Sequence, residues 1–361
     1  MRGPDEVRCL PRAEAAFSDL RAAQRYALQV DDLDTALTIV CSIREFALRA
    51  MRYEALTWAD QAVALGGSGH HPLLAVAKGL QAFGAWVRGE YDVALDFATA
   101  AGSEEQRAGT DPSGLVERVQ ANVLLGTGDI DAGIDATRRQ LELAQESGDP
   151  SRMAHASYML SVAHGSIGDP DTAVEFATKA RDLGMETRCP TDLASGMVAI
   201  GFASQDRDAA LAAFAESDRL ARSVGNRWMS TFARTELHAL LLPDATDPTE
   251  AVAGLAEAID IWFRAGEWSQ QWHTLSRCVI GLAAIDEPDL AAEVIGAIER
   301  HSTLGAPPVM PVLRSEVLDT ADRLAADLGP RYEELCAAGA ELPVVDVVHR
   351  TRAALLHTAR Q

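Results

Sequence analysis

The heptapeptide Gly-Asp-Pro-Asp-Thr-Ala-Val at residues 168–174 belongs to a pattern that recurs along the chain. Close variants are Gly-Glu-Tyr-Asp-Val-Ala-Leu at 89–95 and Gly-Asp-Ile-Asp-Ala-Gly-Ile at 128–134, so the copies start 39 and 40 residues apart. Weaker copies stand at 51–56, 206–211, 247–252 and 287–292. A constant period of this length predicts a solenoid, in which each repeat buries its apolar face only against its neighbours.

The residue types of the repeat predict two helices in each unit. Glycine adopts the left-handed conformation that ends a helix at little cost, and the following Asp or Glu caps the next helix and faces the positive end of its dipole. Further glycines are expected to close the second helix of a unit. They are Gly148, Gly184, Gly225 and Gly266. The expected fold is an all-α, TPR-like solenoid of about seven helical hairpins, with the array in 1–305 and closing helices of the same solenoid in 306–361.

The charge of the chain restricts its partners. The formal net charge is −21, from 53 acidic and 32 basic residues. Such a balance repels phosphate backbones and anionic membrane surfaces, so we expect no direct binding to nucleic acid and no membrane association. Hydrophobic residues make up 48% of the sequence, which is ample for a continuous helical core.

The cysteines and the start of the chain bear on its location. The five cysteines are scattered and form neither a CxxC pair nor a Cys/His cluster, so no disulfide framework or zinc site is indicated. They are Cys9, Cys41, Cys189, Cys278 and Cys336. Residues 1–6 lack an apolar stretch of the kind found in signal peptides, and no apolar run of about 18 residues occurs. We therefore expect a cytoplasmic protein that is neither secreted nor membrane-spanning.

No catalytic motif is found in the sequence. A phosphate-binding GxxxxGK[ST] loop, a GxGxxG loop after a strand, and the HExxH and GxSxG motifs are absent. His70 and His71 are adjacent in a glycine-rich loop, which favours a solvated loop over a metal site. His155 and His164 are nine residues apart in one expected helix and are interpreted as ordinary interface or surface histidines. We expect a protein that is not an enzyme, with no cofactor and no metal.

The most distinctive segment is rich in tryptophan. Trp262, Trp268 and Trp272 lie within eleven residues, together with Gln270 and Gln271. One interpretation is a ligand-binding wall formed by Trp262, Trp268, Gln271 and Trp272; the other is packing between helices. We favour packing, because Trp268 and Trp272 are four residues apart and share one helix face. Packing predicts two buried indoles, a turn that joins the sixth hairpin to the seventh, and a hydrogen bond from Gln271 across that joint.

Several segments resemble motifs of one bacterial family. Residues 17–23 resemble an "NLRxA" pattern, 262–275 resemble "GxWxQQWxTL", and 328–333 with 337–342 resemble "LGxxxFxxxxxxGxxL". With these motifs the chain resembles the helical C-terminal tail of STAND-type ATPases of high-G+C bacteria. Those proteins are related to maltose-type and LuxR-type transcription activators, and some carry a nucleotide-cyclase domain. The resemblance implies a TPR-like tail that senses a signal and holds the ATPase off. The family's ATPase core, cyclase domain and DNA-reading helix-turn-helix are absent from this sequence.

These observations lead to one functional hypothesis and one alternative. The hypothesis is a non-catalytic module for protein interaction and signal sensing in a bacterial regulatory system. Its concave groove would bind a protein segment or a small effector, and its partner would be a regulatory ATPase or cyclase. The alternative is a transcription regulator, or a fragment of one, that acts with a separate ATPase, cyclase or DNA-binding part.

Overall fold

The protein is built from helices. The structure, a computed structural model, describes residues 3–67, 69–109, 113–301 and 311–358. Within those ranges it contains α-helices, one short 3-10 helix and no strand, which confirms the predicted all-α fold. The predicted division after residue 305 stays a prediction, because 302–310 lie outside the described residues.

The helices of the N-terminal half are α1 (Glu6–Gln29), α2 (Leu33–Ser42), α3 (Arg44–Arg49), α4 (Glu54–Gly66), α5 (Leu74–Val87), α6 (Tyr91–Ala108), α7 (Leu115–Gly126), α8 (Ile130–Glu146) and α9 (Pro150–Ser166). Those of the C-terminal half are α10 (Pro170–Thr187), α11 (Pro190–Ala203), α12 (Arg207–Ser223), α13 (Arg227–Leu241), η1 (Leu242–Asp244), α14 (Thr249–Ala265), α15 (Trp268–Ala284), α16 (Pro288–His301), α17 (Pro311–Leu328), α18 (Pro330–Ala340) and α19 (Val344–Thr358).

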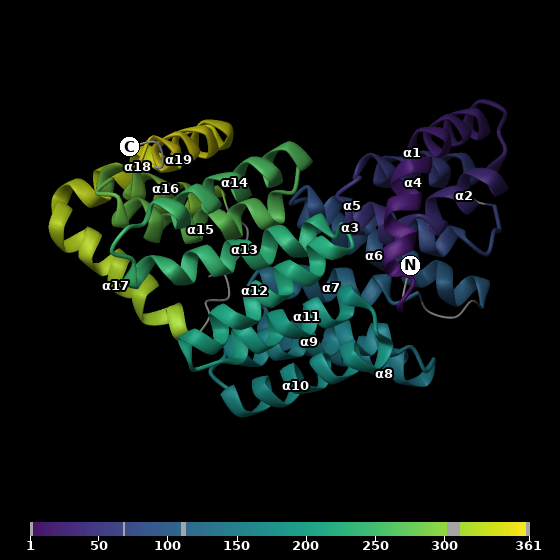
Figure 1. Cartoon of the computed structure of the whole chain (residues 1–361). Coiled ribbons are helices and arrows are strands. Elements are labelled where there is room, and N and C mark those ends of the chain that lie inside the picture. Colours follow the sequence, from purple (N-terminus) through teal and green to yellow (C-terminus); the bar gives the residue numbers. More distant parts are fainter. Residues whose placement is uncertain (1–2, 68, 110–112, 302–310, 359–361) are drawn as a thin grey trace.

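Consecutive helices form hairpins, and the hairpins stack into a strongly curved array (Figure 1). Every helix from α4 to α15 packs against the next one in the chain. The chain passes from α1–α6, through α7–α12 at the bottom of the view, to α13–α19 on the other side. The curvature brings α13 against α3 and α15 against α5. Repeats that are far apart in sequence therefore touch, and the inner face of the array becomes partly enclosed.

The predicted helix boundaries are confirmed at the clearest copies of the repeat. Asp129 caps α8 by accepting a hydrogen bond from the backbone N–H of Ala132, and Asp169 caps α10 in the same way through Thr172. The glycines before these caps are left-handed, with φ of 87° at Gly128 and 81° at Gly168. Gly89 is also left-handed, with φ of 76°, but the side chain of Glu90 after it makes no capping hydrogen bond. The sequence period thus corresponds to a real turn of the chain at each copy.

The prediction that Gly184 ends a helix is wrong. Helix α10 continues to Thr187, and Arg188 takes the left-handed conformation with φ of 52°. Gly184 lies instead where α10 crosses α11, and a Cβ atom there would come within 2.6 Å of the Leu193 Cα. Glycine is needed here for the close approach of two backbones, not for termination. The other three predicted stops are left-handed glycines: Gly148, Gly225 and Gly266.

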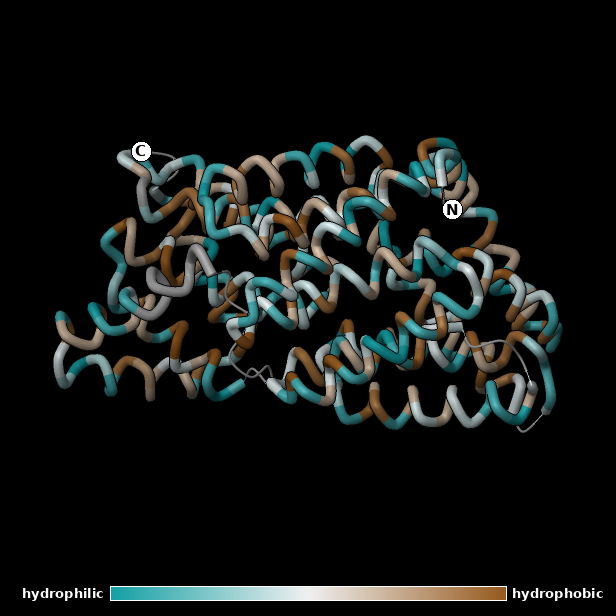
Figure 2. The backbone as a smooth tube through the Cα atoms, turned by 90° about the horizontal axis from the view of Figure 1, so that it is seen from below, coloured by the Kyte–Doolittle hydropathy of each residue, from teal (hydrophilic) through white to brown (hydrophobic). Residues whose placement is uncertain are grey.

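Small residues form the contacts between helices. Alanines on α6 and α10 are completely buried, including Ala94, Ala98, Ala173 and Ala177. Hydrophobic and hydrophilic residues alternate along the helices of the whole array (Figure 2), as expected when each helix buries one face against its neighbours. Among the described residues, no helix combines the length and the apolar character that crossing a bilayer requires.

Candidate functional site

A cavity of about 230 Å³ lies on the inner side of the array. Most of its walls come from α3, α5, α7, α9, α11, α13 and α15, which, from α5 on, are alternate helices of the array, and Gln140 reaches it from α8. The aromatic lining residues are Tyr53, Phe83, Trp86, Tyr158, Phe202, Trp228 and Phe232. The charged ones are Arg44, Glu45, Arg49, Arg118, Arg152 and Asp192, and the amides are Asn122, Gln140, Asn226 and Gln270. The cavity is therefore amphipathic.

Helical periodicity explains how each inner helix reaches the cavity. On α7 the lining residues include positions 115, 118, 122 and 125, and on α9 they include 152, 155, 159 and 162. Residues three and four positions apart lie on one face of a helix. Each of these two helices thus turns one face that mixes polar and apolar residues inward.

Stacked rings form the apolar part of the wall. The ring centroids of Trp228 and Phe232 on α13 are 5.3 Å apart with an interplanar angle of 13°. Phe232 also stacks on Phe202 of α11 at 6.0 Å and on His273 of α15 at 5.4 Å. Three inner helices are joined by this column, which offers flat apolar surface to a bound group.

A buried ionic group supports the polar part of the same wall. Glu236 of α13 has no exposed surface and accepts hydrogen bonds from His273 Nε2 and, at 3.3 Å, from Arg277 Nε. Burial opposes ionisation of Glu236, but the charges of Arg277 and His273 outweigh it and lower the pKa of the carboxyl. Burial lowers the pKa of His273. The hydrogen bond to Glu236 holds the His273 ring in one orientation at the cavity surface.

Two arginines stand on the wall formed by α7 and α9. The guanidinium carbon of Arg118 lies 5.2 Å from the centroid of the Phe83 ring, a cation–π contact. Burial raises the pKa of Tyr53 and Tyr158, and the positive charge of Arg118 opposes both shifts, so Arg118 lies near both phenols. Arg152 lies on the inward face of α9, and its guanidinium lies beside Gly114 in the connection between α6 and α7.

The N-terminus of α1 is bound to residues of the cavity wall. Glu6 is completely buried and accepts hydrogen bonds from the Thr191 backbone N–H at 2.9 Å, the Thr191 hydroxyl at 2.5 Å and the Cys189 thiol at 3.1 Å. It also forms an ion pair with Arg49. Asn226 donates to the Thr191 hydroxyl at 2.9 Å. One buried carboxylate thereby joins α1, the end of α3 and the start of α11.

A second closing contact lies near the start of α15. Tyr53 donates a hydrogen bond to Glu267, and the Ser269 hydroxyl donates to the same carboxylate at 2.6 Å. Glu267 is buried, and this burial raises its pKa to about 7 despite hydrogen bonds from Ser269, Tyr53 and Trp228. Tyr53 and Ser269 both line the cavity. The contact therefore joins the first repeats to the later ones at the cavity wall.

The four residues that we considered for a ligand wall lie beside the cavity rather than on its surface. Trp262 has no exposed surface, Trp272 is 7% exposed and Trp268 is half-buried. Trp268 makes an edge contact with Phe263 at 6.1 Å and packs against the core of α14, α15 and α19. Their neighbours Ser269, Gln270 and His273 line the cavity instead. A binding role for the tryptophans and Gln271 stays a prediction.

The predicted hydrogen bond of Gln271 is wrong. Gln271 is completely buried, and neither its amide nitrogen nor its oxygen has a partner among the described residues. The side chain is buried in the first turn of α15, where no described residue reaches its amide.

The histidines that the sequence singled out have different surroundings. His70 contacts Arg107 at 2.6 Å and His71 contacts Asp34 at 3.1 Å. His164 bonds the N-cap residue Asp169 at 3.1 Å. His155, interpreted from sequence as an ordinary histidine, lines the cavity. Within the part of the chain that the structure describes, no group of three or more His, Cys, Asp or Glu side chains could hold a metal ion.

Sequence reasoning missed the cavity itself. Its polar residues are spread over helices from α3 to α15 and form no local motif. One signal in the sequence could have revealed the cavity. On the inner face of alternate helices, Arg, Asn, His and Tyr occupy positions where ordinary core packing would have apolar residues. Arg118, Asn122, His155 and Tyr158 illustrate this pattern.

The comparisons with known proteins identify the fold. The chain is similar to the solved structure "Crystal Structure of Rap Protein Complexed with Competence and Sporulation Factor", with a TM-score of 0.56 and 12% sequence identity. The similarity covers 96% of this chain and 99% of that chain. No protein-family model matches the sequence, and no curated protein matches it. The likeness supports one class, an all-α solenoid of TPR-like helical repeats.

Proposed function

We propose that this chain is a non-catalytic, signal-sensing module that binds a short segment of polypeptide in the cavity. The observation that supports this function is the cavity lining, which combines stacked aromatic rings with amide and hydroxyl groups on the inner face of the array. Ligand sites commonly have this composition, because apolar contact supplies affinity and a few polar groups fix orientation. The similar Rap protein was solved as a complex with Competence and Sporulation Factor, which agrees with a binding role for the fold.

A polypeptide segment suits the chemistry of this lining. Each residue of an extended segment presents an N–H donor and a C=O acceptor, and its side chains point alternately to opposite sides. The amides of Asn122, Gln140 and Gln270 each offer a donor and an acceptor of the same kind. The column of Trp228, Phe232 and Phe202 offers apolar surface for the side chains.

The resemblance to STAND-type tails supplies the partner and the setting of the proposal. We infer that the chain acts in the bacterial cytoplasm and reports its bound state to a regulatory ATPase or cyclase within a transcription-regulating system. The test is to add the purified chain to the ATPase or cyclase encoded beside its gene and to measure that enzyme's rate. A rate that the chain does not change, with or without peptide, contradicts this partner.

Peptide binding is tested by filling the cavity. Val162 lies on the cavity side of α9, and Val174 lies exposed on the outer helix α10. The purified chain is mixed with a library of random hexapeptides, unbound peptide is removed, and the retained peptides are measured by mass spectrometry. We expect Val162→Trp to abolish retention, because the indole occupies the cavity.

The matched control is Val174→Trp, which adds the same indole outside the cavity and should retain peptides as the wild type does. Equal melting temperatures of the two variants show that both are folded. Retention of no peptide by the wild type contradicts the proposal, and so does equal retention by the two variants. If the chain specifically retains a non-peptide small molecule and no peptide, the ligand of the cavity is a small effector.

A further inference from the structure

The charged side chains of the cavity lining have partners within the chain. Arg49 forms an ion pair with the buried Glu6. Burial raises the pKa of Glu117 and the charge of Arg152 opposes this shift, so these two groups lie close together. Arg118 stacks over a ring and, like Arg152, makes further interactions inside the protein. Selectivity for a ligand is therefore expected from the neutral polar groups of the lining.

One neutral group of the lining has its hydrogen-bonding state fixed by the fold. Burial opposes ionisation of Glu236, but Arg277 and His273 outweigh burial and lower the pKa of the carboxyl. A carboxylate only accepts hydrogen bonds, so the Nε2 atom of His273 carries the proton in the bond between them. Burial lowers the pKa of His273, so the ring is neutral and has no second N–H. Its Nδ1 atom is therefore an acceptor.

The acceptor of His273 lies at the cavity without a donor from the chain. His273 lines the cavity and is 7% exposed, and its side-chain hydrogen bond within the described residues is the one to Glu236 through Nε2. Gln270, one turn earlier on the same face of α15, also lines the cavity, and its Oε1 atom has no partner in the described ranges. This face of α15 thus offers two acceptors that a ligand or water can satisfy.

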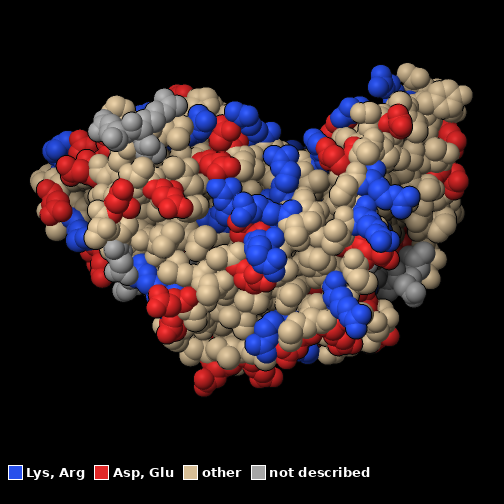
Figure 3. Space-filling view, in the orientation of Figure 1, with Lys and Arg blue, Asp and Glu red and all other residues tan. Residues whose placement is uncertain are grey.

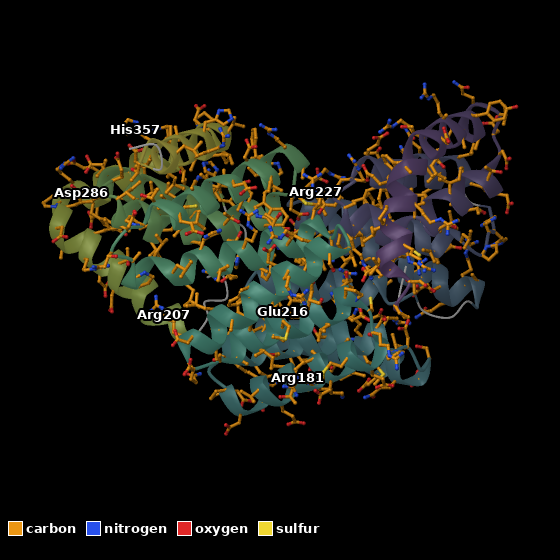
Figure 4. The ribbon with its side chains drawn as sticks, viewed as in Figure 1. Arg181, Arg207, Glu216, Arg227, Asp286 and His357 are labelled. Carbon is orange, nitrogen blue, oxygen red and sulfur yellow. The ribbon has the colours of Figure 1, made fainter. Side chains whose placement is uncertain are left out.

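The rings beside His273 begin close to the outer surface. Figure 3 shows a notch in the surface between the α1–α6 side and the α13–α19 side of the array, and Figure 4 labels the exposed Arg227 near this notch. Its neighbour Trp228 is half-buried and lines the cavity. One turn further along α13, Phe232 is 7% exposed and stacks on both Trp228 and His273. Exposure therefore falls along the rings toward His273.

We propose that the cavity selects peptides with an aromatic side chain that carries an N–H or O–H donor, and that His273 accepts the hydrogen bond from this donor. The inference rests on the proposed peptide-binding function. The ring planes of Trp228 and His273 lie within 13° and 29° of the Phe232 plane, so a ring that stacks in this column meets the imidazole edge to edge. Glu236 is a positioning residue, because it fixes the proton on Nε2 and leaves Nδ1 to the ligand.

Indole and phenol side chains supply both parts of this recognition. Each has a flat apolar face for the stacked rings and a donor on the ring edge for Nδ1 of His273. A phenylalanine side chain offers the same face but leaves Nδ1 unpaired in a water-poor complex, which is costly. A lysine side chain offers a donor but no flat face. The site therefore distinguishes aromatic side chains by the donor that they carry.

The test uses pools of hexapeptides that differ in one fixed residue. The pools carry Tyr, Phe, Trp, Lys or benzothienylalanine, the isostere of Trp in which sulfur replaces the N–H. Retention on the full-length chain is measured by mass spectrometry. We expect retention of the Tyr pool to exceed that of the Phe pool, and Trp to exceed its isostere, by about tenfold or more. The two comparisons distinguish the phenol from the indole as the source of the donor.

Variants connect the preference to His273. His273→Phe keeps a flat ring but removes both nitrogens, so the Tyr and Phe pools should be retained equally. His273→Gln can donate to Glu236 and still present an oxygen to the cavity, so it should keep part of the preference. The control His349→Phe replaces an exposed histidine that contacts Phe263 and should change nothing. Melting temperatures are measured for every variant, and His273→Gln keeps the test valid if His273→Phe does not fold.

The role of Glu236 has a spectroscopic readout of its own. In the ¹⁵N-labelled chain near pH 7, the imidazole signals that are lost in His273→Gln should show a protonated Nε2 and an unprotonated Nδ1. Addition of the Tyr pool should shift the Nδ1 signal, because this atom then accepts a hydrogen bond, and the Phe pool should not shift it. A proton on Nδ1 in the free protein would overturn the assignment of the acceptor.

The outcomes separate this inference from the function on which it rests. Equal retention within both pairs of pools, or strongest retention of the Lys pool, overturns the donor inference and leaves peptide binding intact. A preference for the Tyr or Trp pool that survives His273→Phe overturns the assignment to His273. Retention of no pool overturns the peptide-binding function, and the donor inference with it.

Discussion

The phenol of Tyr53 donates a hydrogen bond to the carboxylate of Glu267, which lies 214 residues further along the chain. Tyr53 stands just before α4 and Glu267 just before α15, so the bond joins the first repeats to the late ones. Neighbours in a linear solenoid touch only in sequence order, whereas this contact turns the array into a closed ring around the cavity. Both residues are buried or nearly so, and the bond is therefore protected from water.

Glu267 should make the stability of the protein depend on pH. Burial raises its pKa from an ordinary value of 4.5 to about 7, so the folded protein holds a proton that the unfolded chain releases. The stabilisation is present at low pH and is lost as the pH rises through about 7. Between about pH 4 and about pH 8, the free energy of unfolding of the wild type should fall by about 3 kcal/mol relative to that of Glu267→Gln. Urea unfolding of both proteins across this range measures the difference.

The glutamine variant is the matched reference for this prediction, because its amide oxygen still accepts the Tyr53 bond but cannot titrate. All other titrating groups are shared, so only the difference between the two proteins matters. A difference that is constant over the pH range would show that Glu267 keeps an ordinary pKa and is better solvated than its burial indicates.

Two glutamates of α1 allow a comparison of buried and exposed ion pairs. Glu6 pairs with Arg49, and both are buried, whereas Glu14 pairs with Arg52, with side chains 47% and 38% exposed. Removing one partner of a buried pair leaves an unpaired charge, so Glu6→Gln should lower the free energy of unfolding by about 3 kcal/mol. Glu14→Gln should lower it by about 0 to 1 kcal/mol, because water screens the exposed pair.

Urea unfolding monitored by circular dichroism measures both losses. Since Glu6 also accepts three hydrogen bonds from α11 and its N-cap, the variant should in addition speed amide hydrogen exchange at the start of α11. Equal and small losses in the two variants would mean that α1 does not hold the ring closed.

The repeat was readable from the sequence because its signals are local. Asp129 and Asp169 cap helices through residues three positions away, and the glycines before them need no distant partner. Ring closure was not readable, because Glu6 and Thr191 are separated by 185 residues and neither lies in a motif. Gly184 was misread for a related reason: a glycine at a helix crossing looks the same in sequence as one that ends a helix. The cavity needs several inner faces at once, so no single segment reveals it.

Gln271 should be a site where an apolar residue stabilises the protein. Its side chain is completely buried, and its amide atoms have no partners among the described residues. A buried amide without hydrogen bonds costs about 1 to 3 kcal/mol, so Gln271→Met, which keeps the length of the side chain, should raise the free energy of unfolding by about 1 kcal/mol. Gln61→Met at an exposed position of α4 is the control and should have no such effect. A loss of stability in Gln271→Met would reveal a hydrogen bond that water or a ligand provides.

Replacing each of the three tryptophans of the α14–α15 turn should destabilise the protein, and the loss of stability should be larger for the more buried ones. Trp262 is completely buried and Trp272 is 7% exposed, so replacing either with Ala should lower the free energy of unfolding by about 3 to 5 kcal/mol. Trp268 is half-buried and packs only partly into the core, so Trp268→Ala should lower the free energy of unfolding by less than the other two substitutions do. Thermal and urea unfolding give these three values.

Peptide retention then separates packing from ligand binding at Trp268. None of the three indoles lines the cavity, whereas Gln270 and His273, on the same helix as Trp268, do. Trp268→Ala should therefore bind the hexapeptide pools as the wild type does, and Gln270→Ala should weaken binding with little loss of stability, because its side chain is turned to the cavity rather than into the core. The reverse pattern, with binding lost in Trp268→Ala and unchanged in Gln270→Ala, would move the ligand from the cavity to the tryptophan face. The two substitutions are two positions apart on one helix, so the comparison tests the direction of the side chain and not the region of the fold.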